Sequence, residues 1–197
     1  MKDIFLKKSI HFITKYKDYS KEDIGKLRYG LEGIYLTFYK LIIILICSFL
    51  LHIFREVLIF LILFNIIRYP AFGFHASTSL ECLIMSLLFI IGLPYLLLHV
   101  HILFWIKIGI CGICIFCFLR YAPADTVKRP LPNVKKRKIR KLCATGCCVL
   151  YSCCFFLLKT SFLGNLFLAA MILETILIHP ITYKIFKQPY RNYLNMI

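Results

Sequence analysis

The amino-acid sequence predicts an all-α integral membrane protein, and three observations lead to that fold class. Hydrophobic residues make up 60% of the 197-residue chain, whereas a soluble domain is nearer half apolar. The apolar residues gather into runs of the length that helices need to cross a bilayer. The 25 Lys and Arg residues, against nine Asp and Glu, give a net charge of +16 and gather at the edges of those runs. We therefore interpret the charge as a topology signal and lipid contact, with no nucleic-acid partner.

About six transmembrane helices follow an amphipathic N-terminal region, residues 1–33, which we expect to lie on the membrane surface. Within that region, Ser20 resembles a helix N-cap, with Asp23 at the third helical position. The second and third apolar runs are shorter than the roughly 20 residues of a full span, so a re-entrant arrangement of these two stays open. The predicted spans are residues 34–54, 57–74, 83–98, 100–119, 142–158 and 161–181.

The connecting segments complete a single predicted membrane domain, residues 1–197. Arg55 and Glu56 are expected to form a polar turn between the first two spans. A basic loop, residues 120–141, separates the first four spans (34–119) from the last two (142–181) and a tail, 182–197. With six spans, most of the 25 cationic residues fall on one side. The positive-inside rule then places both termini, the basic loop and the polar segment 68–82 in the cytoplasm.

Segment 68–82 is a short polar stretch between two apolar runs, and it contains one histidine and one cysteine. His75 and Cys82 have the residue types of an imidazole base and a thiolate nucleophile. A cysteine attacks as its thiolate, which a nearby imidazole or a helix N-terminus stabilises. One of the hydroxyl residues 77–79 can cap a helix that begins near Cys82. The non-functional alternative is a juxtamembrane loop in which this pair has no catalytic role.

The spacing of the two residues adds a geometric constraint. Positions seven apart on one helix are separated by about 10 Å along the axis. A base needs about 3 Å to its proton, so His75 and Cys82 cannot lie on one straight helix and meet. Pro70 and Gly73 favour a bend between them, and the other solution is a site shared by two subunits.

The motif Arg68-x4-Gly73-x-His75-Ala76-x5-Cys82 resembles the signature of the accessory gene regulator B (AgrB) family. A second match follows at residues 121–126, Tyr-Ala-Pro-Ala-Asp-Thr, and continues at residues 129–131, Arg-Pro-Leu. The resemblance extends along nearly the whole chain. One departure is Phe72, where the family often has a glycine, and it bears on how freely the loop bends.

The resemblance implies a bacterial cell-membrane cysteine endopeptidase, with Cys82 and His75 catalytic, that matures a quorum-sensing signal from a small AgrD-like propeptide. It implies cleavage through a thioester acyl-enzyme and ring closure to a thiolactone or a lactone, with no cofactor. It also makes a homodimer attractive. Arg68 and Gly73 are expected to support the site. A basic cluster is expected to hold an acidic propeptide tail, or to act only as a topology determinant: Lys135, Lys136, Arg137, Lys138, Arg140 and Lys141.

Two further functions stay open at this point. A non-enzymatic peptide transporter would depend on the charges within spans, Lys107 and Glu174, which could pair with each other or face a polar cavity. A metal-binding protein would depend on the cysteine-rich spans. Cys111, Cys114 and Cys117 share one helical stripe without a histidine or carboxylate, so we interpret them as packing residues and predict no metal site.

Overall fold

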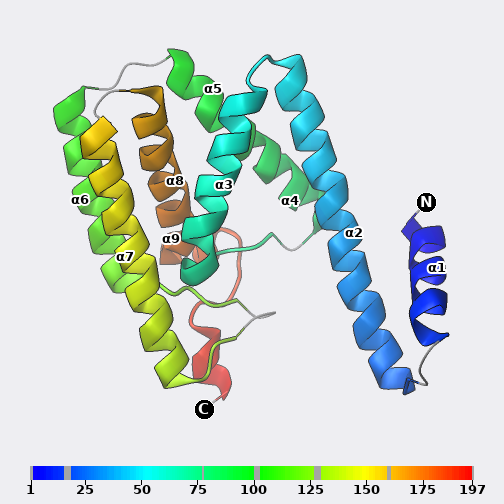
Figure 1. Ribbon diagram of the computed structural model, residues 1–197. Helices are drawn as coiled ribbons and strands as arrows, with labels where there is room; N and C mark the ends of the chain where they lie inside the picture. Colours follow the sequence, from blue (N-terminus) through cyan, green and yellow to red (C-terminus); the bar gives the residue numbers. More distant parts are fainter. Residues whose placement is uncertain are drawn as a thin grey trace. The chain divides into compact units, whose positions relative to one another are not determined.

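The computed structural model describes residues 2–15, 19–76, 78–99, 103–126, 130–158 and 161–196. Within these ranges the chain is all-helical, as predicted, apart from one isolated parallel bridge between Phe72 and Ala124 (Figure 1). The elements are α1 (Lys2–Thr14), α2 (Lys21–Leu50), α3 (Phe54–Ala71), α4 (Ser79–Ser86), the π-helical turn η1 (Leu87–Ile91), α5 (Gly92–His99), α6 (Phe104–Tyr121), α7 (Val134–Leu158), α8 (Phe162–Ile178), α9 (Pro180–Ile185) and the 3₁₀ turn η2 (Asn192–Met196).

The chain divides into two compact units, Met1–Cys47 and Ser48–Ile197. The first unit contains α1 and most of α2. The predicted cap is confirmed, because Ser20 Oγ accepts a hydrogen bond from the Asp23 N–H over 3.1 Å and α2 begins at the next residue. An ion pair of 2.7 Å between Lys2 and Glu32 joins the two helices.

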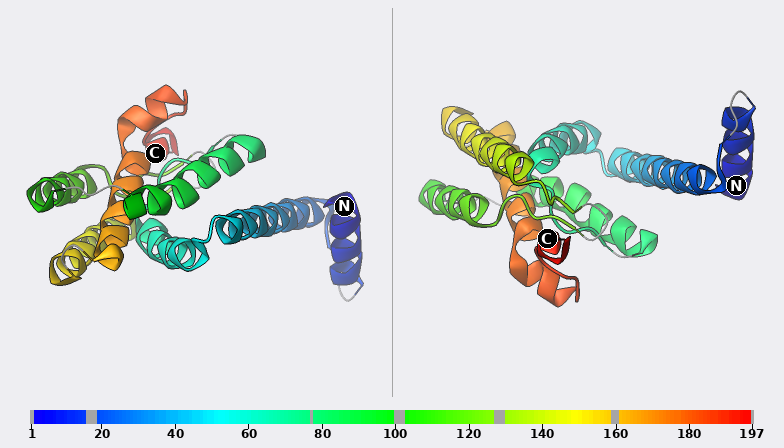
Figure 2. Two further views of the ribbon diagram at one scale, coloured as in Figure 1. Left: turned by 90° about the horizontal axis from the view of Figure 1, so that it is seen from above. Right: turned by 90° about the horizontal axis from the view of Figure 1, so that it is seen from below.

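The second unit is built around α8, which contacts α3, α5, α6, α7 and α9. Figure 2 shows α8 (orange) between the α6–α7 pair and α3 (teal). The sequence of α8 explains this position, since it is apolar on all sides and its buried residues include Leu166, Ala170 and Leu173. A helix that other segments of the protein cover on several sides can be shorter than a helix that faces lipid.

Four of the described helices are long and apolar enough to cross a membrane. They are Glu22–Leu50, Ser79–His99, Phe104–Tyr121 and Val134–Leu158, and α8 is a shorter apolar helix. The 18-residue α3 carries three charged residues, Arg55, Glu56 and Arg68. The chain is therefore an all-α membrane protein, and its count of six spans stays a prediction.

Three predicted boundaries differ from the structure in the first half of the chain. The turn after α2 lies at residues 51–53, and Arg55 and Glu56 belong to the first turn of α3. The third run, predicted as residues 83–98, is a continuous 21-residue helix, Ser79–His99. It is longer because a polar first turn, which hydropathy does not count, precedes the apolar residues. The fourth run begins at Phe104 instead of residue 100.

The basic loop predicted at residues 120–141 is also shorter in the structure. Arg120 lies in the last turn of α6, and α7 begins at Val134, so the basic cluster is helical. Asn133 Oδ1 accepts a hydrogen bond from the Lys136 N–H over 3.1 Å, as an N-cap residue does. Lysine and arginine are good helix formers, which hydropathy alone does not register. At the other end, α8 stops at Ile178, and Pro180 begins α9 within the predicted last span and tail.

Candidate active site

The chain between His75 and Cys82 leaves the helical path. Helix α3 ends at Ala71, α4 begins at Ser79, and the described residues between them are not helical. The exposed His75 belongs to the 72–76 segment, whereas Cys82 belongs to α4. The geometric constraint is thereby confirmed, because the two residues do not share one straight helix.

Cys82 lies in the first turn of α4, four residues after the helix cap. The Thr78 side chain accepts a hydrogen bond from the Glu81 N–H, and the Glu81 carboxylate accepts one from the Thr78 N–H. This capping box fixes the start of the helix and confirms that a hydroxyl residue caps it. The half-buried Cys82 thiol therefore lies near the capped N-terminal end of α4.

The 72–76 segment is bound to two distant parts of the chain by backbone hydrogen bonds. The Gly73 N–H donates to Ala124 O, and the Ala124 N–H donates to Ala71 O, each over 2.9 Å. These bonds join the two sequence motifs, 68–82 and 121–126, directly. The Phe74 N–H donates to Leu177 O at the end of α8 over 2.8 Å. The backbone next to His75 is thus held at fixed points.

A buried ion pair supports the same segment from within. Arg68 Nη1 lies 3.3 Å from Glu174 Oε2, and Arg68 Nη2 donates to Phe74 O over 2.7 Å. Glu174 is fully buried, and the Arg68 side chain is only 17% exposed. Arg68 therefore points into the protein. Its guanidinium fixes the carbonyl of Phe74, which directly precedes His75.

The two charges within spans do not pair with each other. Glu174 binds Arg68, while Lys107 donates to Asn165 Oδ1 over 2.7 Å. The alternative in which Lys107 and Glu174 form a pair is therefore wrong. The sequence identified Glu174 as a charge that is energetically costly within a span, but it did not predict the contact of Glu174 with Arg68. No spacing rule relates these two residues, which are 106 positions apart.

Gly73 makes the closest approach between this segment and α8. Its φ of +105° is a conformation that side-chain-bearing residues rarely adopt. A Cβ atom there would lie 3.1 Å from Glu174 Oε1, 3.2 Å from Leu177 O and 3.3 Å from Arg68 Nη1. Phe72 also has a positive φ, of 63°. A non-glycine residue in that region costs about 1–3 kcal/mol, so surrounding contacts must hold the bend.

Aromatic and polar contacts from the C-terminal part complete the support. The buried Phe74 ring stacks on Phe186 with centroids 4.5 Å apart and meets Tyr183 edge-on. Burial raises the pKa of Tyr183, so its phenol keeps its proton and donates to Ala124 O over 3.1 Å. Gln188 Nε2 donates to His75 O over 3.1 Å. Sequence reasoning missed these tail residues, because an isolated Tyr or Gln carries no motif.

The six basic residues of the predicted substrate-binding cluster separate into groups on α7. Arg140 Nη1 donates to Tyr69 O over 2.9 Å, and its guanidinium lies 4.4 Å from the centre of the Phe72 ring. Arg137, Lys138 and Lys141 line a pocket of about 390 Å³. The remaining two, Lys135 and Lys136, are exposed and do not line that pocket.

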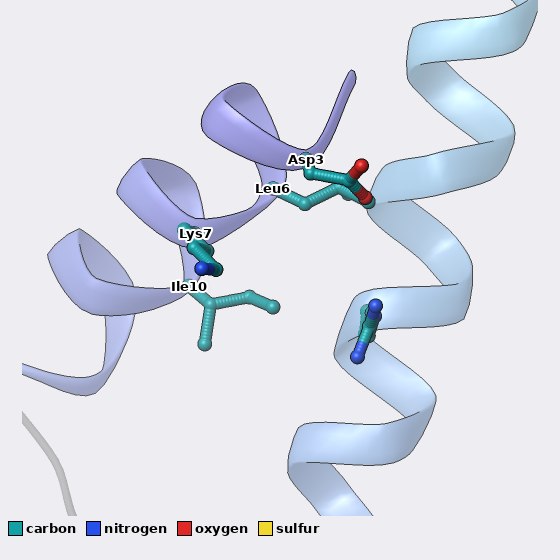
Figure 3. A pocket seen from close by; sticks show the side chains of 5 residues that line it. Asp3, Leu6, Lys7 and Ile10 are labelled. Carbon is teal, nitrogen blue, oxygen red and sulfur yellow. The ribbon is translucent and has the colours of Figure 1, made fainter. Parts of the chain in front are cut away.

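The N-terminal unit has a hollow of its own, of about 320 Å³, between α1 and α2. Leu6 and Ile10 of α1 point toward α2, as Figure 3 shows. Lys7 and Arg28 also line the hollow. The hollow is therefore lined by both apolar and charged side chains. The predicted position of this region on the membrane surface stays a prediction.

The predicted packing role of the span cysteines agrees with their burial. Cys111, Cys114 and Cys117 are buried on α6. Cys148 Sγ lies 3.7 Å from Met171 Sδ in the core between α7 and α8. These thiols behave as small apolar residues at helix contacts.

Comparison with known proteins identifies a family. The family profile described as accessory gene regulator B matches residues 6–178. An AgrB-like protein of Clostridium acetobutylicum is 31% identical over 87% of this chain and 82% of its own length. An AgrB-like protein of Listeria monocytogenes is 27% identical over 98% and 92%. The accessory gene regulator protein B of Staphylococcus saprophyticus is 32% identical over 82% of each chain. No solved structure matches the chain.

Proposed function

We propose that this chain, which belongs to the accessory gene regulator B family, is a membrane cysteine endopeptidase. Its membership of the family supports a role in the processing of a quorum-sensing peptide. Its substrate would be a small AgrD-like propeptide, cleaved on the C-terminal side of the future signal. The observation that carries this proposal is the position of Cys82, half-buried at the capped start of α4, next to a non-helical segment that presents the exposed His75.

The chemistry proceeds in two acyl transfers. His75 takes the proton of the Cys82 thiol, and the thiolate attacks the peptide carbonyl carbon. The C–N bond then breaks, the imidazolium gives its proton to the leaving amine, and a Cys82 thioester remains. A cysteine thiol or serine hydroxyl within the bound fragment next attacks the thioester carbonyl. The thiolactone or lactone ring closes, and Cys82 leaves as a thiolate that recovers the proton.

Arg68 and Gly73 have positioning roles in this proposal. The Arg68–Glu174 pair and the contacts of Gly73 with α8 hold the 72–76 segment, and therefore the backbone of His75, against the bundle. A base held within a narrow range of positions loses less entropy on reaching the transition state. Neither residue needs to touch the reacting atoms to act in this way.

The decisive experiment is co-expression of the propeptide with single cysteine variants. Cys82→Ala and Cys82→Ser should both abolish cleavage, and Cys143→Ala, which removes an exposed thiol on α7, should retain it. Iodoacetamide should modify Cys82 and inactivate the wild type. In the untreated enzyme, a thioester adduct between Cys82 and the propeptide fragment should be detectable by mass spectrometry. Full cleavage by Cys82→Ala would overturn the enzyme proposal and favour a transporter.

The exposed lysines are the proposed contacts for an acidic part of the propeptide. Lys135 and Lys136 are free of the contacts that engage Arg140 with Tyr69 and Phe72. The double variant Lys135→Gln/Lys136→Gln should raise the KM for propeptide more than it lowers kcat. An unchanged KM would remove these two residues from the substrate-binding proposal.

Orientation and assembly complete the proposal. We infer a cytoplasmic active-site segment and cytoplasmic termini from the charge distribution. A membrane-impermeant thiol reagent should leave Cys82 unmodified in intact cells and modify it in inverted vesicles. A homodimer is also proposed, and co-purification of two differently tagged copies tests it.

A further inference from the structure

The pocket of about 390 Å³ lies where α6, α7 and the C-terminal tail meet. Arg120 and Tyr121 contribute from the end of α6, and Arg137, Lys138 and Lys141 from the first turns of α7. Positions 134, 137, 138 and 141 all line it, and this spacing is that of one helix face. Tyr190, Arg191 and Tyr193 contribute from the tail. The pocket therefore gathers cations from three segments that are far apart in the sequence.

The charge of the lining favours an anion. Five cationic side chains line the pocket: Arg120, Arg137, Lys138, Lys141 and Arg191. The only carboxylate among the lining residues is Asp125, and it already accepts hydrogen bonds from the Leu131 and Tyr193 N–H groups. Both bonds go to Asp125 Oδ2, and both donors are backbone N–H groups instead of any of the five cations.

One donor in this lining has no acceptor within the described part of the chain. Nη1 of Arg137 is buried and makes no hydrogen bond there, although the guanidinium lies over the Tyr193 ring, 3.1 Å from its centre. Stacking orients the plane of the guanidinium but supplies no oxygen for its N–H groups. An unsatisfied buried donor costs about 1–3 kcal/mol, so an anionic oxygen in the pocket would relieve a penalty.

The pocket also lies at the level where spanning helices emerge from the apolar layer. Arg120 is the penultimate residue of the spanning helix α6, and Lys141 directly precedes the apolar part of α7, which begins at Leu142. Tyrosine is enriched at membrane–water interfaces, and three tyrosines line this pocket. Basic pockets at the ends of transmembrane helices bind phosphate-bearing lipid headgroups.

We propose that this pocket binds the phosphate of an anionic phospholipid headgroup. Arg137 and Lys138 supply donors from α7, and Arg120 and Arg191 supply them from α6 and the tail. The lipid thereby ties the tail to the bundle. Because Gln188 of that tail donates to His75 O, an occupied pocket also steadies the segment that carries the histidine.

The test uses the full-length protein in a neutral detergent, with phosphatidylglycerol, phosphatidylcholine and inorganic phosphate as separate probes. Native mass spectrometry gives the apparent Kd, and thermal unfolding gives a second readout. Phosphatidylglycerol should bind and raise the Tm, whereas the zwitterionic lipid and free phosphate should not. Lys138→Gln/Lys141→Gln should weaken phosphatidylglycerol binding by about tenfold or more, the scale expected for two headgroup contacts.

The matched control is Lys135→Gln/Lys136→Gln, which removes the same charge from the same helix but outside the pocket. It should change the Kd by less than about threefold, since screened charges away from the headgroup contribute little. All four lysines are exposed, so both variants should keep the fold, which circular dichroism checks.

Three outcomes would overturn the proposal. Equal losses in both double variants would indicate diffuse electrostatic attraction. Stabilisation by inorganic phosphate equal to that by the lipid would indicate a soluble-anion site. Binding of a glutamate-rich peptide that depends on Lys138 and Lys141, without lipid binding, would indicate a peptide site. None of these measurements uses the propeptide, so the lipid proposal and the enzyme proposal fail independently.

Discussion

The two halves of the proposed active site are held in different ways. The 72–76 segment is fixed to α8, to the 121–126 motif and to the tail by backbone bonds, a buried ion pair and packed aromatic rings. Helix α4, which carries Cys82, has no buried residue, and its Leu80 and Ile84 are 68% and 54% exposed. The proposed base therefore lies in an anchored loop, and the proposed nucleophile lies on a helix without buried residues.

This difference suggests how an enzyme can process a peptide at a membrane. A substrate needs access to the proposed nucleophile, and Cys82 is only half-buried. The base needs a defined position, and the anchored segment provides it. Mutations that break the buried ion pair or the close approach at Gly73 should therefore cost more stability than a mutation at the start of α4. The following predictions run from the largest expected effect to the smallest.

Arg68→Gln should have the largest effect. Removing one partner of a buried ion pair costs about 3–5 kcal/mol, because the other charge is left uncompensated. The double variant Arg68→Gln/Glu174→Gln should regain most of that stability but not the cleavage activity, since the bond from Arg68 to Phe74 O is still lost. Thermal unfolding in detergent and propeptide cleavage are the two measurements. Full activity in the double variant would contradict the positioning role of Arg68.

Gly73→Ala should come next. The added methyl group requires a strained backbone, at about 1–3 kcal/mol, and meets three atoms at 3.1–3.3 Å. The 72–76 segment must then move away from α8, so kcat should fall more than KM rises. Gly92→Ala is the control, because a Cβ there meets nothing within 4 Å. Similar kinetics for the two variants would show that the close approach is not needed.

Thr78→Ala tests the α4 side of the comparison. Loss of an N-cap side chain costs about 0.5–2 kcal/mol, and the start of α4 should fray. Thr78→Ser should retain the cap and act as the control. The rate of Cys82 alkylation at a fixed pH should rise in Thr78→Ala, because a frayed helix start exposes the half-buried thiol. An unchanged rate would show that the cap does not hold Cys82 in place.

Tyr183→Phe should have the smallest effect. It removes the hydroxyl that donates to Ala124 O while keeping the ring against Phe74, so the cost is about 0.5–1.5 kcal/mol. Tyr183→Ala should cost several times more, about 3–5 kcal/mol, because a fully buried ring leaves a cavity. Comparable unfolding temperatures for the two variants would show that the hydroxyl, and not the ring, carries the contribution of Tyr183.

The sequence predicted the helical class, the apolar runs and the cap at Ser20, because these depend on local composition and spacing. It also located Cys82 and His75 and required a bend between them. It misplaced the start of α7 and the turn after α2, since hydropathy does not register helices that begin with charged residues. The sequence could not predict the hydrogen-bond partners of Arg68 and Lys107. These contacts join residues 106 and 58 positions apart, so they follow from helix packing and not from sequence spacing.

By itself, then, the sequence determined which segments are apolar helices and which residues have the chemistry of a thiol and a base. Hydrophobic periodicity and residue type are local properties, and they are known from the sequence without the fold. Only the tertiary structure decided that Arg68 turns inward to Glu174, that residues 72–76 bond to the 121–126 motif, and that the basic cluster separates into a pocket face and an open face. Each of these contacts depends on which helices pack around α8. A buried charge or carbonyl group binds the polar group that this packing places within hydrogen-bond distance.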